Sequence, residues 1–382
     1  FSTFNTDAIK EADFHAGGFP AQYGGRLGSI LNIVNREGNT EEVTGSANIS
    51  LISSKALIEG PLPTFGSESI KGSWMIAGRR TYFDVIANAF YKHVVLPRLD
   101  PVDREDSPDK IFPYYFYDFQ GKVNLDVGSD HRLTWSSFYG DDVLNWDFQA
   151  DYSSDDWEDE GYEPDGGYYF EERDSSVFDW RWGNFTNSLS WRWIISPKLI
   201  ARTFIANSRF RFAVDFDYAD EFYSHNDYDT SSSQSSFGFD LFDRINDNSV
   251  ESNVTWLAND AHNVLAGFQH KEVHFQLGMI LGAQEIYNGV QEAFRDTIMW
   301  MESKPAESAI YFQDQWKLNP LLSLQTGLRV ARYSLHDTTY FEPRLGLKYF
   351  LSEKVSLKGS VGRYHQFLTV ANPPDENLRF LD

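Results

Sequence analysis

The chain has 382 residues, no Cys and 16% aromatic residues, and its 56 acidic against 33 basic side chains give a formal charge of -23. Phosphate would repel such a chain, which argues against nucleic-acid binding, and the lack of Cys excludes thiolate metal sites, iron-sulfur clusters and disulfides. No run approaches the roughly 18 apolar residues of a membrane-spanning helix, whereas the short alternating strands of a membrane β-barrel remain compatible with the sequence.

The first 40 residues form a distinct segment. Between His15 and Gly38 the chain places five Gly and Pro20 ahead of a short apolar strand that begins at Ile30. These glycines permit tight turns and close approach of the backbone to a neighbour. The run does not match the glycine spacing of phosphate-binding loops, so it does not predict a nucleotide site.

From about Val43 onward the dominant signal is alternation of apolar and polar residues, which predicts β-strands with one apolar and one wet face. Tyr117, Phe119 and Gly121, for example, alternate with Asp118, Gln120 and Lys122. Thirteen strands are expected, at 43–52, 55–62, 69–79, 114–127, 131–140, 177–195, 199–216, 245–258, 263–277, 306–317, 322–335, 341–351 and 354–367.

The predicted connections alternate in length. Tight turns are expected at 128–130, 196–198, 259–262, 319–321 and 352–353, and long loops at 81–113, 141–176, 217–244 and 278–305. In an up-and-down barrel every second connection emerges on the same side, so this alternation predicts an outer-membrane barrel with short turns on one rim and long loops on the other. A soluble sandwich or propeller is the alternative, although its loops need not keep this parity.

The negative charge is concentrated in two of the predicted loops. Asp141 to Asp174 holds fourteen acids and one base, and Asp215 to Asp243 holds eight acids and no base. One acidic run is a candidate site for Ca²⁺ or a cationic ligand, since its carboxylates are hard oxygen ligands. The alternative is a solvated charge run without a ligand. The candidate residues are Asp155, Asp156, Trp157, Glu158, Asp159 and Glu160.

A second, weaker candidate for a metal site lies on the strand at 263–277. His270, Glu272 and His274 alternate there, so they project from one face. Ligands spaced about 7 Å apart on one strand are too distant to share an ion without help from elsewhere. The alternative is that these residues belong to the wet, lumen-facing side of a barrel strand.

The glycine-rich run resembles the end of the plug domain of TonB-dependent receptors of bacterial outer membranes. The resemblance rests on Gly17 to Leu27, on the strand from Ile30 to Gly38, and on shorter matches at 58–62, 78–82, 311–314 and 342–344. It implies that residues 1–40 are the C-terminal part of a plug and residues 41–382 the N-terminal part of a barrel. The expected fold is an incomplete, all-β transmembrane antiparallel barrel, with about thirteen of 22 strands.

The resemblance also implies a function and its partners. We expect active uptake of a scarce ligand, such as a siderophore, metal chelate, glycan or peptide, across the bacterial outer membrane. The partners would be outer-membrane lipid, the external ligand and the TonB-ExbB-ExbD complex, which would act through a segment missing from this chain. No cofactor is expected. Gly24, Gly25 and Arg26 would lie where the plug meets the barrel wall, and the alternative for Arg26 is a surface position on a turn.

Two other classes of function compete with this one. A passive porin or surface adhesin would also be a barrel, but a simple porin has no folded domain ahead of its first strand. A secreted glycan-binding or glycan-cleaving β-protein would need carboxylates at a catalytic separation, and nothing in the sequence fixes such a pair. An enzyme is therefore not expected.

Overall fold

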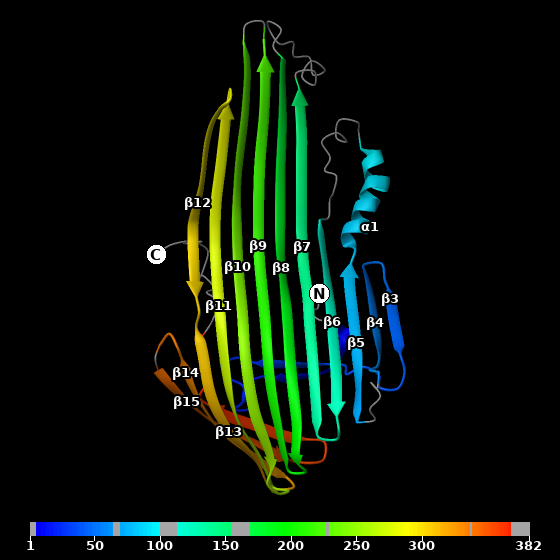
Figure 1. The fold of residues 1–382 in the computed structure, drawn as a ribbon, viewed down its shortest axis with the longest axis vertical. Coiled ribbons are helices and arrows are strands. Elements are labelled where there is room, and N and C mark those ends of the chain that lie inside the picture. Colours follow the sequence, from blue (N-terminus) through cyan, green and yellow to red (C-terminus); the bar gives the residue numbers. More distant parts are fainter. Residues whose placement is uncertain are drawn as a thin grey trace.

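The alternating strands form one large antiparallel sheet, which we call the wall sheet (Figure 1). The computed structural model describes residues 5–63, 69–99, 113–153, 169–226, 229–336 and 338–367. Fourteen strands pair in the order β16-β15-β14-β13-β11-β10-β9-β8-β7-β6-β5-β4-β3, with β12 paired to β11. Figure 1 shows β7 to β11 side by side along the long axis, and β13 to β15 curving round their lower end.

The strands of the wall sheet have unequal lengths. They are β3 (Thr44–Ile49), β4 (Ser53–Pro61), β5 (Ile70–Thr81), β6 (Tyr114–Val127), β7 (His131–Ser153), β8 (Tyr169–Ser196), β9 (Leu199–His225), β10 (Thr230–Leu257), β11 (His262–Tyr287), β12 (Val290–Ser303), β13 (Ala306–Asn319), β14 (Leu322–Tyr333), β15 (Thr338–Phe350) and β16 (Ser356–Gly362). All thirteen expected strands are present, and the five predicted tight turns fall between strands. The antiparallel transmembrane barrel fold is thereby confirmed.

Three of the predicted long loops are largely strand, which corrects the expectation from the sequence. β7 and β8 extend into 141–176, and β9 and β10 leave only Asn226 to Asp229 between them. Alternation of apolar and polar residues continues into the acidic region, where Leu144, Trp146 and Phe148 alternate with Asn145, Asp147 and Gln149. A high density of acidic residues therefore does not exclude a strand, which needs only a contrast between its two faces. At 230–236 both faces are polar, so the backbone pairs although no alternation marks the strand.

The strand β12 was missed for a related reason. It continues the line of β13 beyond Lys304 and Pro305 and pairs only with β11, so nearly all its residues are exposed. An irregularity of register at Met279 and Ile280 also changes which β12 residues share a face. The loop expected at 278–305 is therefore a β-hairpin with its turn at Asn288 and Gly289.

Residues 5–40 lie against one face of the wall sheet. We call the described part, residues 5–40, the N-terminal segment; it contains a 3₁₀ turn (η1, Thr6–Ala8) and the antiparallel pair β1 (Ile9–His15) and β2 (Ile30–Asn35). Ala8 packs with the wall residues Leu57, Met75 and Ala77 in a small buried cluster. The face of the sheet that contacts the segment is called the inner face, and the opposite one the outer face.

The connection from β5 to β6 contains the one α-helix found among the described residues. It begins with α1 (Phe83–Phe90), followed by η2 (Tyr91–Val95) and η3 (Leu96–Arg98), and α1 lies beyond the upper end of β5 (Figure 1). Within the described residues, no helix combines the length and apolar character needed to cross a bilayer.

Candidate functional site: the contact between the N-terminal segment and the wall

Two buried arginines of the inner face hold the N-terminal segment. Arg329 on β14 is 0% exposed and Arg344 on β15 is 6% exposed. Their strands are neighbours, and Arg329 is directly opposite Glu342 in the register. A buried guanidinium needs both a counter-charge and hydrogen-bond acceptors, and the wall and the segment together provide them.

Arg344 binds the backbone of a turn in the segment. Its Nη1 donates to the carbonyl oxygens of Phe19, Pro20 and Tyr23 at 3.3, 2.5 and 2.6 Å. Its Nη2 donates to Glu342 Oε2 at 2.7 Å, which compensates the charge. The guanidinium also lies over the rings of Phe19 and Tyr364, with Cζ 5.1 and 4.5 Å from their centroids. Planar geometry and multiple donors make arginine suited to such a contact.

Arg329 binds the adjacent part of the same turn. Its Nη1 donates to the Gln22 carbonyl at 3.1 Å, and its Nη2 donates to Gln269 Oε1 at 2.7 Å and Glu307 Oε1 at 2.9 Å. Gly24 lies against this guanidinium, since a Cβ at Gly24 would be 2.2 Å from Arg329 Nε. The absence of a side chain at residue 24 is therefore a packing requirement.

The turn that the arginines bind is shaped by its own sequence. Phe19 and Ala21 are 1% and 0% exposed, and the Ala21 amide donates to Gln313 Oε1 of the wall at 2.8 Å. The Tyr23 amide closes the turn by donating to the Pro20 carbonyl at 3.1 Å. Gly18 has a left-handed φ of 60°, which glycine adopts at little cost. In this turn four carbonyl groups face the wall, those of Phe19, Pro20, Gln22 and Tyr23.

A second contact lies where the segment leaves the inner face. The Glu37 carbonyl accepts from Asn124 Nδ2 at 2.7 Å and Ser73 Oγ at 2.5 Å, and the Glu37 carboxylate pairs with Arg132 at 3.1 Å. Partial burial alone would raise the pKa of Glu37, but the charges of Arg132 and Lys10 outweigh it and hold the pKa below its usual value. This carboxylate therefore helps to hold the segment in its charged form.

Of the plug-wall residues expected from sequence, the structure brings only the glycines to the wall contacts described above. Gly24 contacts Arg329, and Gly25 takes a left-handed φ of 69° near Glu307. Arg26 is exposed, and among the described residues its side chain makes one hydrogen bond, in which Nη1 donates to the Gly25 carbonyl at 2.9 Å. The buried cations at this contact come from the wall, not from the segment.

The candidate metal residues on β11 are not brought together. His270 bonds to Ser308 and His274 to Glu302, in each case on a neighbouring strand. Gln269 and Lys271, with the opposite parity, belong to the inner face, so these histidines lie on the outer face and not toward the lumen. Within the part of the chain that the structure describes, they do not form a group of converging ligands.

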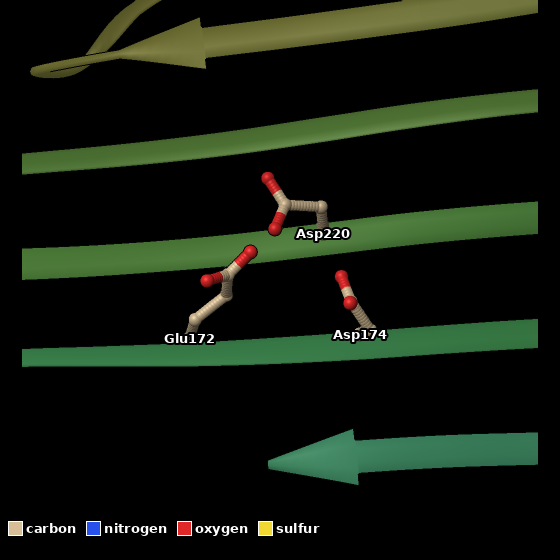
Figure 2. Close-up of side chains that lie close together, drawn as sticks. All are labelled: Glu172, Asp174 and Asp220. Carbon is tan, nitrogen blue, oxygen red and sulfur yellow. The ribbon is translucent and has the colours of Figure 1, made fainter. Parts of the chain in front are cut away.

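The one converging group of acidic ligands in the described residues is Glu172, Asp174 and Asp220 on β8 and β9 (Figure 2). One carboxylate oxygen from each lies within 4.8 Å of the others. Ca²⁺ takes six to eight oxygen ligands, so three carboxylates do not complete a site, and Asp174 also accepts from the Tyr218 hydroxyl at 2.9 Å. The predicted acidic run from Asp155 to Glu160 lies outside the described residues.

Sequence reasoning missed the four charged wall residues that dominate this contact, Arg329, Arg344, Glu307 and Glu342. The sequence around Pro343 could have indicated this site. Glu342 and Arg344 flank Pro343 in a strand whose other residues alternate between apolar and polar. Two opposite charges at i and i+2 share one face of a strand. On an inner face, such a pair indicates a contact with another part of the chain.

Comparison with known proteins agrees with this architecture. A family model described as TonB dependent receptor-like, beta-barrel, matches residues 115–377, which is more than half of the chain. The chain belongs to this family of outer-membrane receptors and transporters, and it is a transport protein of the barrel class and not an enzyme. No curated protein matches the sequence.

Three solved structures matched the chain at low identity and low TM-score. The siderophore receptor PirA from Pseudomonas aeruginosa has 12% identity and a TM-score of 0.24, with 93% of this chain and 83% of that chain covered. The toluene transporter TodX from P. putida has 9% identity, a TM-score of 0.28, and coverage of 81% and 75%. The copper transporter OprC has 9% identity, a TM-score of 0.25, and coverage of 90% and 70%.

Proposed function

We propose that the chain belongs to a receptor of the bacterial outer membrane that takes up a scarce external ligand with energy from the TonB-ExbB-ExbD complex. In this proposal residues 1–40 are the end of a plug and residues 41–382 belong to the barrel around it. The observation that carries the proposal is the clamp made by Arg329 and Arg344, which holds the segment through its backbone carbonyls.

The charge arrangement of the clamp suits a plug that is released and rebound. Arg329 pairs with Glu307 and Arg344 pairs with Glu342, and all four residues belong to the wall. If the segment withdraws, both pairs remain intact, so no buried charge is left without a partner. Release then costs the carbonyl hydrogen bonds and the burial of Phe19 and Ala21, which a pulling force can overcome stepwise.

The ligand class is left open among a siderophore, a metal chelate, a glycan and a peptide. Acidic side chains dominate the parts of β7 to β10 farthest from the tight turns. At physiological salt, this charge acts over a Debye length of about 8 Å and disfavours anionic ligands near the rim. A cationic or neutral ligand is therefore the better electrostatic match.

These 382 residues contain no Cys, so an introduced thiol provides a direct test in a full-length protein from which any Cys outside them has been removed. Ala21→Cys would place a single thiol at a position that is 0% exposed. A membrane-impermeant maleimide should label it only when the segment leaves the wall. We expect labelling to increase in cells that contain TonB and are given one of a panel of siderophores, metal chelates, glycans or peptides, and not in cells that lack TonB.

A matched control is Gly28→Cys, because a Cβ at Gly28 meets no atom within 4 Å. This thiol should be labelled in both strains whenever the reagent reaches it. Equal labelling of Ala21→Cys with and without TonB would contradict energised release and would favour the passive porin instead. Recovery of the protein in a soluble fraction without detergent would contradict the membrane location.

A further inference from the structure

The outer face of the wall changes character along the long strands. Near the tight turns it carries exposed apolar side chains, including Trp191, Trp193 and Trp256, and this apolar surface ends at Trp135, Leu189 and Ile205. The next positions of the same face are Asn187, Asn207 and Asn248, followed by Phe185, Arg209 and Asn246. On β9 and β10 the outer face therefore passes from apolar side chains to amide and guanidinium groups within two or three positions.

The height of this boundary matches a bilayer. Arg209 is ten residues from Leu199, where β9 begins at its tight turn. Ten residues at a rise of about 3.3 Å and a tilt of about 40° climb about 25 Å, which is the height of the apolar band of outer-membrane barrels. The guanidinium of Arg209 therefore lies at the level where lipid headgroups begin.

Three arginines gather at this level in a chain that is otherwise acidic. Arg244 is directly opposite Arg211 in the register of β9 and β10, and Arg209 is two residues from Arg211 on the same face. Arg211 pairs with Asp141. Arg209 and Arg244 have only aromatic partners among the described residues, with Cζ 5.7 Å from the centroid of Phe185 and 4.6 Å from that of Phe242.

Like charges directly opposite on neighbouring strands are destabilising unless an anion lies between them. Within the described part of the chain, Arg211 has its carboxylate and the facing Arg244 has none. The arrangement leaves two positive charges for a ligand from outside the chain. Phosphate is suited to such a site because guanidinium groups bind its oxygens bidentately.

Asparagine amides add neutral donors beside the arginines. Asn207 Nδ2 donates to Asn246 Oδ1 at 2.8 Å and to Asn248 Oδ1 at 2.7 Å. Both accepting oxygens are thereby used, and the N–H groups of Asn246 and Asn248 have no acceptor among the described residues. Asn246 on β10 and Phe185 on β8 are both directly opposite Arg209, so amide and guanidinium groups occupy neighbouring positions of the same face.

A shallow hollow of about 490 Å³ lies directly below these donors on the outer face. Trp135, Leu189, Ile205 and Val250 give it an apolar side toward the bilayer. The amides of Asn207 and its neighbours form the opposite side, and Glu272 lies at its β11 edge. A hollow with one apolar and one donor-rich side matches a molecule with an acyl chain and an anionic head.

We propose that this outer-face site binds a phosphorylated membrane lipid, with its phosphate on Arg209, Arg244 and Asn246 and an acyl chain over Leu189 and Ile205. The site is separate from the clamp on the inner face and does not depend on transport of a ligand. It requires only that the wall be embedded in a membrane. Its effect would be to fix the height of the barrel and stabilise the facing arginines on β9 and β10.

The test uses the full-length protein in neutral detergent, with bound lipid counted by native mass spectrometry. The probes are dioctanoyl phosphatidic acid, dioctanoylglycerol and inorganic phosphate. We expect phosphatidic acid to bind at least about tenfold more tightly than either other probe, which corresponds to one charge-assisted contact or more. The double variant Arg209→Gln, Arg244→Gln should lose about tenfold in affinity for phosphatidic acid while binding dioctanoylglycerol as before.

A matched control is the double variant Arg192→Gln, Arg202→Gln. These two arginines are also directly opposite each other, on β8 and β9, but they lie on the inner face. Unchanged binding in this control supports the proposal. Equal losses in both double variants would overturn it, as would equal binding of phosphatidic acid and dioctanoylglycerol. Inorganic phosphate that binds as tightly as phosphatidic acid would also overturn it, because the site would then recognise an anion and not a lipid.

Discussion

Replacing Arg344 by lysine separates the two roles of this residue in the clamp. Lysine keeps the charge for Glu342, but its single ammonium cannot also reach the three carbonyls of Phe19, Pro20 and Tyr23 in the geometry of a planar guanidinium. Losing a hydrogen bond to a charged group costs about 1.5–3 kcal/mol. We therefore expect the segment to leave the wall about tenfold to a hundredfold more often in Arg344→Lys.

The assay is the rate of maleimide labelling of Ala21→Cys in the purified full-length protein, without TonB. When labelling is slower than reclosure, this rate is proportional to the fraction of time that residue 21 is exposed. Arg344→Met should have a larger effect and also lower the stability of the wall by about 3–5 kcal/mol, because Glu342 loses its buried partner. The backbone amide of His365 still donates to Glu342, so we expect the loss of stability to lie near the lower end of this range.

Arg202→Lys is the control for this experiment. Arg202 lies on the inner face of β9, is exposed, and makes no ion pair among the described residues. It should leave the labelling rate within about twofold of the parent, since exposed substitutions change stability by about 0.5 kcal/mol or less. If Arg344→Lys behaves like Arg202→Lys, the carbonyl contacts do not hold the segment and the clamp is refuted.

Three further predictions concern the segment itself. Gly24→Ala should destabilise the contact by about 1–3 kcal/mol through overpacking and so increase labelling of Ala21→Cys by at least about fivefold. Gly28→Ala should not, because nothing lies within 4 Å of a Cβ there, and equal rates would refute the packing role. Arg26→Ala should lower the free energy of unfolding by no more than about 0.5 kcal/mol, as measured from the thermal midpoint in detergent. A larger loss would show that Arg26 makes a contact that the structure lacks. Because the pKa of Glu37 is lowered in the folded protein, its contribution is present above the ordinary value of 4.5 and is lost as pH falls through the lower folded value. Wild-type protein should therefore lose more stability than Glu37→Gln below pH 4.5, and parallel pH profiles would contradict this assignment.

Some of the site was predictable from local sequence. Glycine and proline between Gly17 and Gly25 require turns wherever the chain goes, so a close approach of this backbone to a neighbour was expected, and the structure has it at Gly24. The partner was not predictable. Arg329 lies more than 300 residues away, and nothing local distinguishes it from the other arginines of the alternating strands.

The boundaries of the strands were also only partly predictable from the sequence. For β6 the sequence prediction and the structure agree to the residue, because the outer face of that strand is apolar and its inner face is polar. For β10 the expected start at residue 245 is 15 residues later than the observed start at Thr230. Residues 230–236 are polar on both faces, and there only pairing with β9 and β11 marks the strand. Phe237, Phe239 and Leu241 do alternate with Gly238 and Asp240, but this run is too short to show where the strand begins.

The sequence by itself determined the class of fold, because period-two alternation and the spacing of the tight turns depend only on residues near one another. It also determined that the excess negative charge lies in two regions and not throughout the chain. The tertiary structure decided which charges are buried and which arginine faces which partner. Burial and counter-charge depend on what packs opposite, and in this protein the residues opposite come from the far end of the chain or from the neighbouring strand.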